Sequence, residues 1–465
     1  MFELALHRLA AILRQNNWVP ELAGILPLSA LIEFIDIPPK LHVLQLAGFA
    51  ALWNSPITPA GSRLLLSEDE DSQYPHCYLD RFGKSIGLFG FDGRYGNRYY
   101  ISSPETVRMC LRAHPSHLIE NSHKNMSGDN LRLQNLEIVH VSRLPSRRSK
   151  TSPSWPGRIL FRSTRVGWGH FCGWAVLIGM AVMSGILRTW LSLAFLGIMP
   201  ITGAVVLALH GSNPRRLLIE KASKYDRLIL VAEHENTTEW FAFYGETTIL
   251  NSLLNRPLKP LGSEQRSAVT TSLRMILRVL ILGQWALALG AAAVKDWNAY
   301  FITSWIAFCI FMQTYVIQPE KGAKKWMKSY AGIKIEHHRT TLSSRRALLN
   351  TLIALNPDTF APLPEKKEKD RSKFAPAAMK WIDPILIQGS ERTRWEVATL
   401  KAINETSASS ASEKMKFQES ITTPSAEWKD EYKNDYWAPF IHEGIYMAAK
   451  IKEEASLLNR RSDEV

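Results

Sequence analysis

Residues 166–209 read VGWGHFCGWAVLIGMAVMSGILRTWLSLAFLGIMPITGAVVLAL, and the only Asp, Glu, Lys or Arg among them is Arg188. An apolar run of 21 or 22 residues lies on each side of that arginine. A bilayer core about 30 Å thick needs roughly 20 apolar residues in a helix that rises 1.5 Å per residue. The stretch therefore predicts two transmembrane helices, joined by so short a turn that they form an antiparallel hairpin.

A second apolar pair follows further along the chain. Residues 279–294 (VLILGQWALALGAAAV) and 297–317 (WNAYFITSWIAFCIFMQTYVI) are separated only by Lys295 and Asp296. The first of these runs is short for a span unless Arg274 and Arg278 extend their side chains to the head groups, as long basic side chains can. We therefore predict an α-helical membrane protein with four transmembrane helices in two hairpins, together with a cytosolic α+β domain.

Basic residues flank both hairpins on the same side. The positive-inside rule then places the N-terminus, the loop 211–273 and the C-terminus in the cytosol. This pattern also explains the formal charge of +13 without a nucleic-acid partner. Basic residues beside spans attract anionic lipids. The residues predicted to face the membrane surface are Arg143, Arg147, Arg148, Lys150, Arg158, Arg162, Arg165, Lys321, Lys324, Lys325 and Lys328.

The sequence also suggests a location. Residues 1–30 lack the features of a secretory signal, so the first span near residue 166 is expected to direct insertion. Spans of 21 or 22 residues fit a thin internal membrane slightly better than a plasma membrane, which favours an endomembrane. Four cysteines in 465 residues exclude a disulfide scaffold.

The domain boundaries follow from these spans. Beside the hairpins we expect a folded N-terminal region, a basic linker, an insert between the hairpins, a helical region, a flexible linker and a C-terminal helix. The predicted boundaries are 1–141, 142–165, 166–209 (hairpin 1), 210–273, 274–317 (hairpin 2), 318–400, 401–426 and 427–465.

Several segments outside the spans have strand patterns. Residues 89–91 and 97–101 form one predicted hairpin around Asp92-Gly93, and residues 131–141 (LRLQNLEIVHV) form a further strand. In the insert, 227–234 and 238–245 form a second hairpin. Because one β-hairpin is marginally stable alone, we expect it to pair with strands of residues 86–141 in a shared sheet.

A cluster of histidines and asparagines spans residues 114–140. Its outline resembles the His-Asn-His nuclease motif, in which one histidine activates water and another binds the metal. The pattern favours a turn at Gly128-Asp129-Asn130 followed by a strand, and the alternative is a metal site with His114, His117 and His123 as the ligands. The pair His337-His338 is interpreted as surface residues rather than as ligands.

Residues 233–258 (EHENTTEWFAFYGETTILNSLLNRPL) resemble a segment of a family of uncharacterised multi-pass membrane proteins of filamentous fungi. The resemblance implies a membrane protein and a fungal source, and no activity or cofactor.

The spans contain no Asp, Glu or Lys, although ion pathways usually need ionisable groups within the membrane. We therefore predict a non-enzymatic scaffold, sensor or adaptor without a cofactor. Its expected partners are the bilayer, a cytosolic protein bound through the C-terminal helix, and a second copy of the chain. The alternatives are a membrane-bound metal-dependent hydrolase that uses residues 114–140, and a small channel or lipid-handling oligomer. In the oligomer, small residues would pack the helices; these are Gly169, Gly173, Gly185 and Gly197.

Overall fold

The computed structural model of the full chain divides into two compact units, each built from three separate stretches of sequence. The membrane unit comprises 1–83, 146–216 and 258–331, and the sheet unit comprises 84–145, 217–257 and 332–465. The residues that the structure describes are 8, 11–12, 15–31, 38–48, 52–54, 77, 79–80, 87–94, 96–122, 132–144, 168–211, 214–218, 221–260, 267–359, 379–412 and 425–455.

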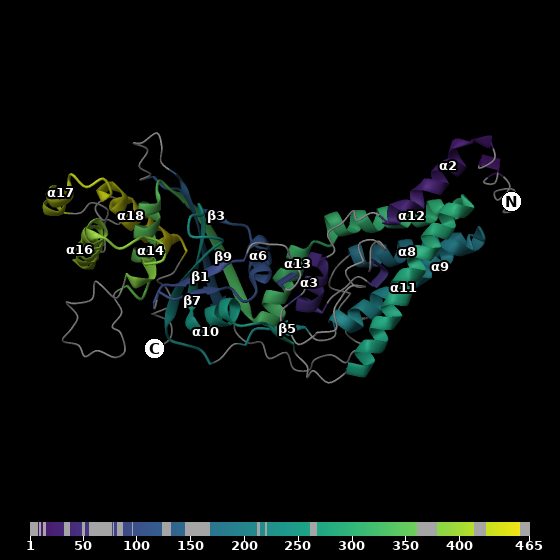
Figure 1. The fold of residues 1–465 in the computed structure, drawn as a ribbon, viewed down its shortest axis with the longest axis horizontal. Coiled ribbons are helices and arrows are strands. Elements are labelled where there is room, and N and C mark those ends of the chain that lie inside the picture. The colour runs from purple at the N-terminus through teal and green to yellow at the C-terminus, as the bar shows by residue number, and fades with distance from the viewer. Residues whose placement is uncertain are drawn as a thin grey trace. The chain divides into compact units, whose positions relative to one another are not determined.

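The membrane unit contains the four predicted apolar helices (Figure 1). They are α8 (Trp168–Ile186), α9 (Trp190–Val206), α11 (Ser267–Val294) and α12 (Trp297–Phe311). Within the described residues, three stretches are long and apolar enough to cross a membrane: Trp190–Gly211, Val269–Val294 and Trp297–Val316. The described apolar part of α8, Phe171–Ile186, is shorter. The third predicted span is longer than expected, because the helix begins well before Arg274.

Both hairpins close with the same kind of turn. Arg188 and Lys295 each adopt a φ of 55°, the left-handed conformation that L-residues rarely visit. Thr189 and Asp296 follow them as the N-cap residues of α9 and α12, and each is followed by a tryptophan. The Asp296 carboxylate accepts a hydrogen bond from a backbone N–H in the first turn of α12. In both hairpins, therefore, the turn consists of a basic residue, a polar N-cap residue and a tryptophan, in that order.

The expected region 1–141 is divided between the two units. Residues up to Gly83 belong with the membrane helices. They include α2 (Trp18–Ile25), the 3-10 turn η1 (Leu26–Leu31), α3 (Pro38–Ala47) and the short turn η2 (Leu52–Asn54).

Two glycines of the predicted spans make room for η2. A Cβ atom on Gly173 would lie 2.1 Å from the Trp53 ring, and one on Gly203 would lie 2.2 Å from the Leu52 carbonyl oxygen. Trp53 is fully buried there, with ring centroids 6.1 Å from Trp305 and 5.8 Å from Phe308. These glycines therefore serve packing within the chain.

The sheet unit is built on one mixed sheet of seven strands in the order β2-β1-β6-β7-β4-β9-β3. Its strands are β1 (Phe89–Asp92), β2 (Arg98–Tyr100), β3 (His117–Leu118), β4 (Gln134–Arg143), β6 (Asp226–Ala232), β7 (Glu239–Glu246) and β9 (Ile333–Leu342). The predicted hairpin of the insert is β6–β7, and it pairs with β1 on one side and with β4 on the other. The expectation of a shared sheet is confirmed.

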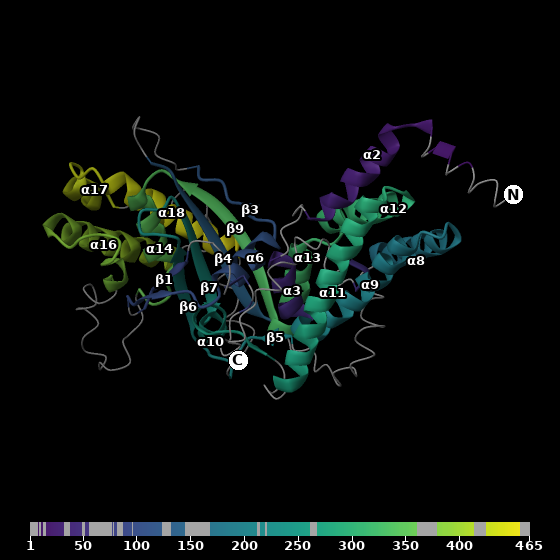
Figure 2. The same ribbon diagram turned by 45° about the vertical axis from the view of Figure 1, so that its right-hand side comes forward.

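Helices cover one face of this sheet (Figures 1 and 2). They are α14 (Arg345–Leu355), α16 (Ser390–Ser412), α17 (Ala426–Tyr432) and α18 (Ala438–Glu454). The core between them and the sheet is rich in tryptophan, with Trp240, Trp381, Trp395, Trp428 and Trp437 all buried. The C-terminal helix thus packs on its own chain, chiefly on α14. The flexible linker expected from residue 401 begins inside α16.

The remaining described elements are short. In the sheet unit they are α6 (Pro104–Arg112), α10 (Thr247–Leu250), η6 (Asn251–Asn255) and η10 (Lys380–Ile382). In the membrane unit they are η5 (Leu207–Gly211), η7 (Met312–Val316), α13 (Pro319–Trp326), η8 (Met327–Ala331) and the paired strands β5 (Arg215–Arg216) and β8 (Lys259–Pro260).

Candidate functional site

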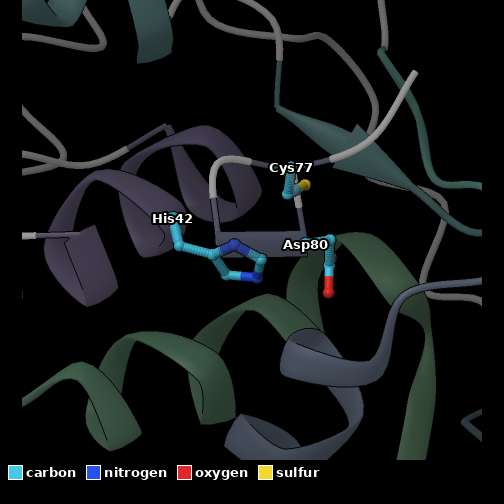
Figure 3. A group of neighbouring side chains, drawn as sticks. All are labelled: His42, Cys77 and Asp80. Atoms are coloured by element: carbon cyan, nitrogen blue, oxygen red, sulfur yellow. The ribbon is translucent and has the colours of Figure 1, made fainter. Parts of the chain in front are cut away.

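One group of three side chains in the described part of the chain could share a metal ion. His42 of α3, Cys77 and Asp80 each offer a ligand atom, and these atoms all lie within 4.8 Å of one another. Figure 3 shows His42 extending from α3 toward Asp80, with Cys77 beside them. His42 and Cys77 are fully buried. Nitrogen, sulfur and carboxylate oxygen are the donors that zinc takes in proteins.

The surroundings of this group keep two of its members uncharged. Burial, and next the charge of Arg215, lower the pKa of His42 to about 3. Burial raises the pKa of the Cys77 thiol to about 12, although Arg215 acts against it. At neutral pH the group therefore holds a neutral imidazole and a thiol rather than a thiolate.

A backbone hydrogen bond selects the imidazole tautomer. The Leu79 N–H donates to Nδ1 of His42 at 3.1 Å, so a neutral ring carries its proton on Nε2. A metal at Nε2 would need that proton moved to Nδ1, where the Leu79 N–H already points. The arrangement fits better a buried polar contact, in which His42 of α3 binds the backbone of the segment that carries Cys77 and Asp80.

The buried His42 contact predicts that the stability of the folded protein depends on pH. Since the folded pKa of His42 lies below its ordinary value of 6.5, the unfolded chain binds the proton more readily, and stability falls as pH drops below 6.5. Between pH 7 and pH 5 this loss amounts to about 2 kcal/mol. The variant His42→Asn keeps an acceptor for the Leu79 N–H. In thermal melts of the detergent-solubilised protein, its melting temperature should fall less between pH 7 and pH 5 than that of wild type. The exposed His234→Asn should behave as wild type, and identical pH profiles for all three proteins would contradict the assignment.

The predicted ligands His114, His117 and His123 are placed differently from expectation. Nδ1 of His114 lies 3.3 Å from the Cys110 carbonyl oxygen, just beyond α6. His117 is exposed on β3, and His123 lies outside the described residues. The structure instead pairs His117 with His338, at matching positions of two parallel strands and with ring centroids 5.6 Å apart.

The interpretation of His337-His338 as a surface pair is wrong, because both side chains are buried in β9. Nε2 of His337 lies 2.8 Å from a carboxylate oxygen of Glu137. His338 faces the opposite side of the sheet, where burial and then the neighbouring His117 lower its pKa. Alternate residues of β9 are buried up to His337, and from His338 onward the residues of the other face are buried instead. Only the strand partners reveal that both histidines are inside.

Polar side chains within the membrane unit form hydrogen bonds between its helices. The Ser192 N–H donates to the Asn298 side-chain oxygen at 2.9 Å, next to the two hairpin turns. Deeper in the unit, the buried Gln284 amide donates to the Thr202 hydroxyl at 3.0 Å. These bonds join α9 to α11 and α12. The Asn298 amide also donates to the Asp296 carboxylate at 2.6 Å, so the contact near the turns includes a carboxylate. Hydrogen bonds between helices are usual for helix packing in lipid.

The predicted membrane-surface residues fall into three groups. Arg143 lies in β4 and forms an ion pair with the buried Glu246 at 2.7 Å, which also lowers the pKa of that carboxyl against the effect of burial. The other six basic residues before the first span, Arg147 to Arg165, lie outside the described residues. The four lysines after the last span, Lys321 to Lys328, lie on α13 and η8.

Comparison with protein families, with curated proteins and with solved structures finds no match to this chain.

Proposed function

We propose that this chain is an integral membrane protein that crosses an endomembrane four times between residues 146 and 331, in two hairpins. Its role is that of a non-enzymatic scaffold, sensor or adaptor of the fungal multi-pass type described above. The observation that carries the proposal is the composition of the sheet. Its strands come from before hairpin 1, from between the hairpins and from after hairpin 2.

This composition favours an even number of crossings in each hairpin. Strand β4 pairs with β7 and with β9, so the three stretches of chain share one sheet. An open sheet cannot bridge a bilayer, because its edges would leave backbone groups without partners in lipid. If α9 crosses the membrane, α8 must cross back. The shared sheet therefore supports a crossing by α8, whose described apolar part is shorter than that of the other three helices.

The orientation follows from charge. The lysine-bearing segment α13 leads from the last span to the sheet, and Lys321, Lys324 and Lys328 are exposed while Ala323 and Trp326 are buried. An amphipathic segment of this kind suits an anionic membrane surface. We therefore place the sheet unit and the C-terminus in the cytosol. The positive-inside pattern taken alone predicts the same side for the N-terminus.

A flux measurement tests the non-enzymatic role against a channel or transporter. The described membrane helices carry no Asp, Glu or Lys that could form a relay, so vesicles that contain the purified protein should leak ions and small solutes no faster than protein-free vesicles. A protein-dependent flux would contradict the scaffold proposal. Of the glycines that would pack an oligomer, Gly173 is occupied by Trp53 of the same chain, whereas a Cβ atom on Gly185 or Gly197 would meet nothing within 4 Å.

The second candidate is the metal-dependent hydrolase, and the pairing of His117 with His338 favours it. Nδ1 of His338 is buried and has no hydrogen-bond partner among the described residues. Under the scaffold proposal, elemental analysis of the purified protein should find no stoichiometric divalent metal. The scaffold proposal fails if wild type binds one equivalent of metal, His117→Ala loses it and the control His234→Ala keeps it. The hydrolase would then be the supported function.

A further inference from the structure

We infer that the N-terminal segment crosses the membrane unit between Gly24 and Pro38. The residues before α2 then lie on the side of the two hairpin turns, opposite to the ends of the spans that lead to the sheet. This inference rests on the four crossings proposed above and adds a fifth. It reverses the expectation that both termini are cytosolic.

The start of the segment lies at the turn end of the spans. The Tyr300 hydroxyl, in the first turn of α12, donates to the Val19 carbonyl oxygen at 2.8 Å. A Cβ atom on Gly24 would lie 3.1 Å from Cε of Lys295, the residue that closes the second hairpin. Val19 and Ala23 form the buried face of α2. In both views α2 lies beside this end of α12 (Figures 1 and 2).

The end of the segment lies at the opposite end of the spans. A Cβ atom on Gly322 of α13, after the last span, would lie 2.2 Å from the Val43 side chain. A Cβ atom on Gly48 would lie 2.8 Å from the carbonyl oxygen of Gly211, where η5 leaves the second span. Helix α3 therefore packs on the connections that lead to the sheet, and the full length of the spans separates these connections from Lys295.

The chain between these two ends is long enough. Fourteen residue steps separate Gly24 from Pro38, and at about 2.0 to 3.3 Å per residue they reach roughly 28 to 46 Å, against a bilayer core of about 30 Å. The described part, η1, packs on both α11 and α12. Backbone that is not α-helical is tolerated at membrane depth where it is packed on protein.

The outer face of α2 matches a lipid environment. Trp18 is 60% exposed and Ile25 is 63% exposed, whereas Val19 and Ala23 of the same helix are buried. Tryptophan is enriched where a helix meets the membrane interface. Helix α11, on which α2 packs, also exposes large apolar side chains, among them Ile276 and Val279.

Cysteine labelling tests this arrangement in the full chain. Single cysteines replace Asn17, Lys224 and Lys295, all exposed, in a background with Cys77, Cys110, Cys172 and Cys309 changed to alanine. A membrane-impermeant maleimide is applied to sealed vesicles with the cytosolic face outward, and again after detergent permeabilisation. We expect Lys224→Cys to label at once, and Lys295→Cys and Asn17→Cys to label only after permeabilisation.

The two controls separate failure of this inference from failure of the four crossings. If Lys295→Cys is protected while Asn17→Cys labels in sealed vesicles, the four crossings are supported and the fifth crossing is refuted. If Lys295→Cys labels in sealed vesicles, the four crossings fail, and the inference fails with them. If a glycosylation sequon introduced before α2 is used by the cell, the N-terminus is lumenal, independently of the chemistry of labelling.

Discussion

Replacing Glu443 with alanine should lower the melting temperature of the solubilised protein by about 10 °C. Glu443 lies in α18 with 1% of its surface exposed. Its carboxylate accepts hydrogen bonds from the Ser343 N–H at 2.8 Å, from the Ser343 hydroxyl and from the Asn121 side chain at 2.8 Å. One carboxylate thus joins the C-terminal helix to the end of β9 and to the chain after β3.

The size of this effect follows from the donors left behind. A buried donor without a partner costs about 1 to 3 kcal/mol, so three of them cost about 3 to 5 kcal/mol once water partly compensates. For a unit of roughly 200 residues each kcal/mol lowers the melting temperature by about 2 to 4 °C. Glu453→Ala, on an exposed position of the same helix, is the matched control and should stay near wild type. Equal melting temperatures for the two variants would mean that Glu443 is not a link between these elements.

Replacing Trp53 with alanine should destabilise the membrane unit to a similar extent. Trp53 fills the room left by Gly173 and contacts Trp305 and Phe308, and none of its surface is exposed. Truncating a buried tryptophan costs about 3 to 5 kcal/mol, because a large cavity remains. The measurement is the fraction of protein that stays monodisperse in size-exclusion chromatography after heating.

Trp190→Ala is the control for this substitution, since Trp190 opens α9 with 65% of its surface exposed. It removes the same side chain from a span without opening a cavity. If both variants lose monodispersity at the same temperature, Trp53 does not hold the N-terminal segment on the bundle. A larger loss for Trp53→Ala alone would also support the placement of that segment among the membrane helices.

Local pattern is enough to predict most elements of this chain. The four apolar runs form helices, and three of them are long and apolar enough within the described residues to cross a membrane. The hairpins around Asp92-Gly93 and around Asn236 and the shared sheet are confirmed, because each depends on residues close in sequence or on a strand that needs a partner. The N-terminal segment is harder to predict. Its apolar runs are too short to read as spans, and nothing in them shows that Trp53 fits against Gly173 of a much later helix.

The candidate site depends even more on distant contacts. His42 and Cys77 are far apart in sequence and carry no metal-binding motif, so only the docking of the chain on α3 brings them together. The sequence singles out His117, but its neighbour His338 lies on a strand that follows both hairpins. Burial of that neighbour comes from strand order, which single-sequence patterns do not reveal.

The order of the strands also determines when the sheet can be completed during synthesis of the chain. β4 lies between β7 and β9, yet both hairpins and the insert are made after β4 ends at Arg143 and before β9 starts at Ile333. At a translation rate of about 5 to 20 residues per second, the edge of β4 waits roughly 10 to 40 seconds for its second partner while both hairpins enter the bilayer. During that interval it exposes unpaired backbone groups, the kind of edge that invites aggregation. Chains interrupted before Ile333 should therefore depend on chaperones at the membrane, and full-length chains should be released from them only after the last span has been inserted.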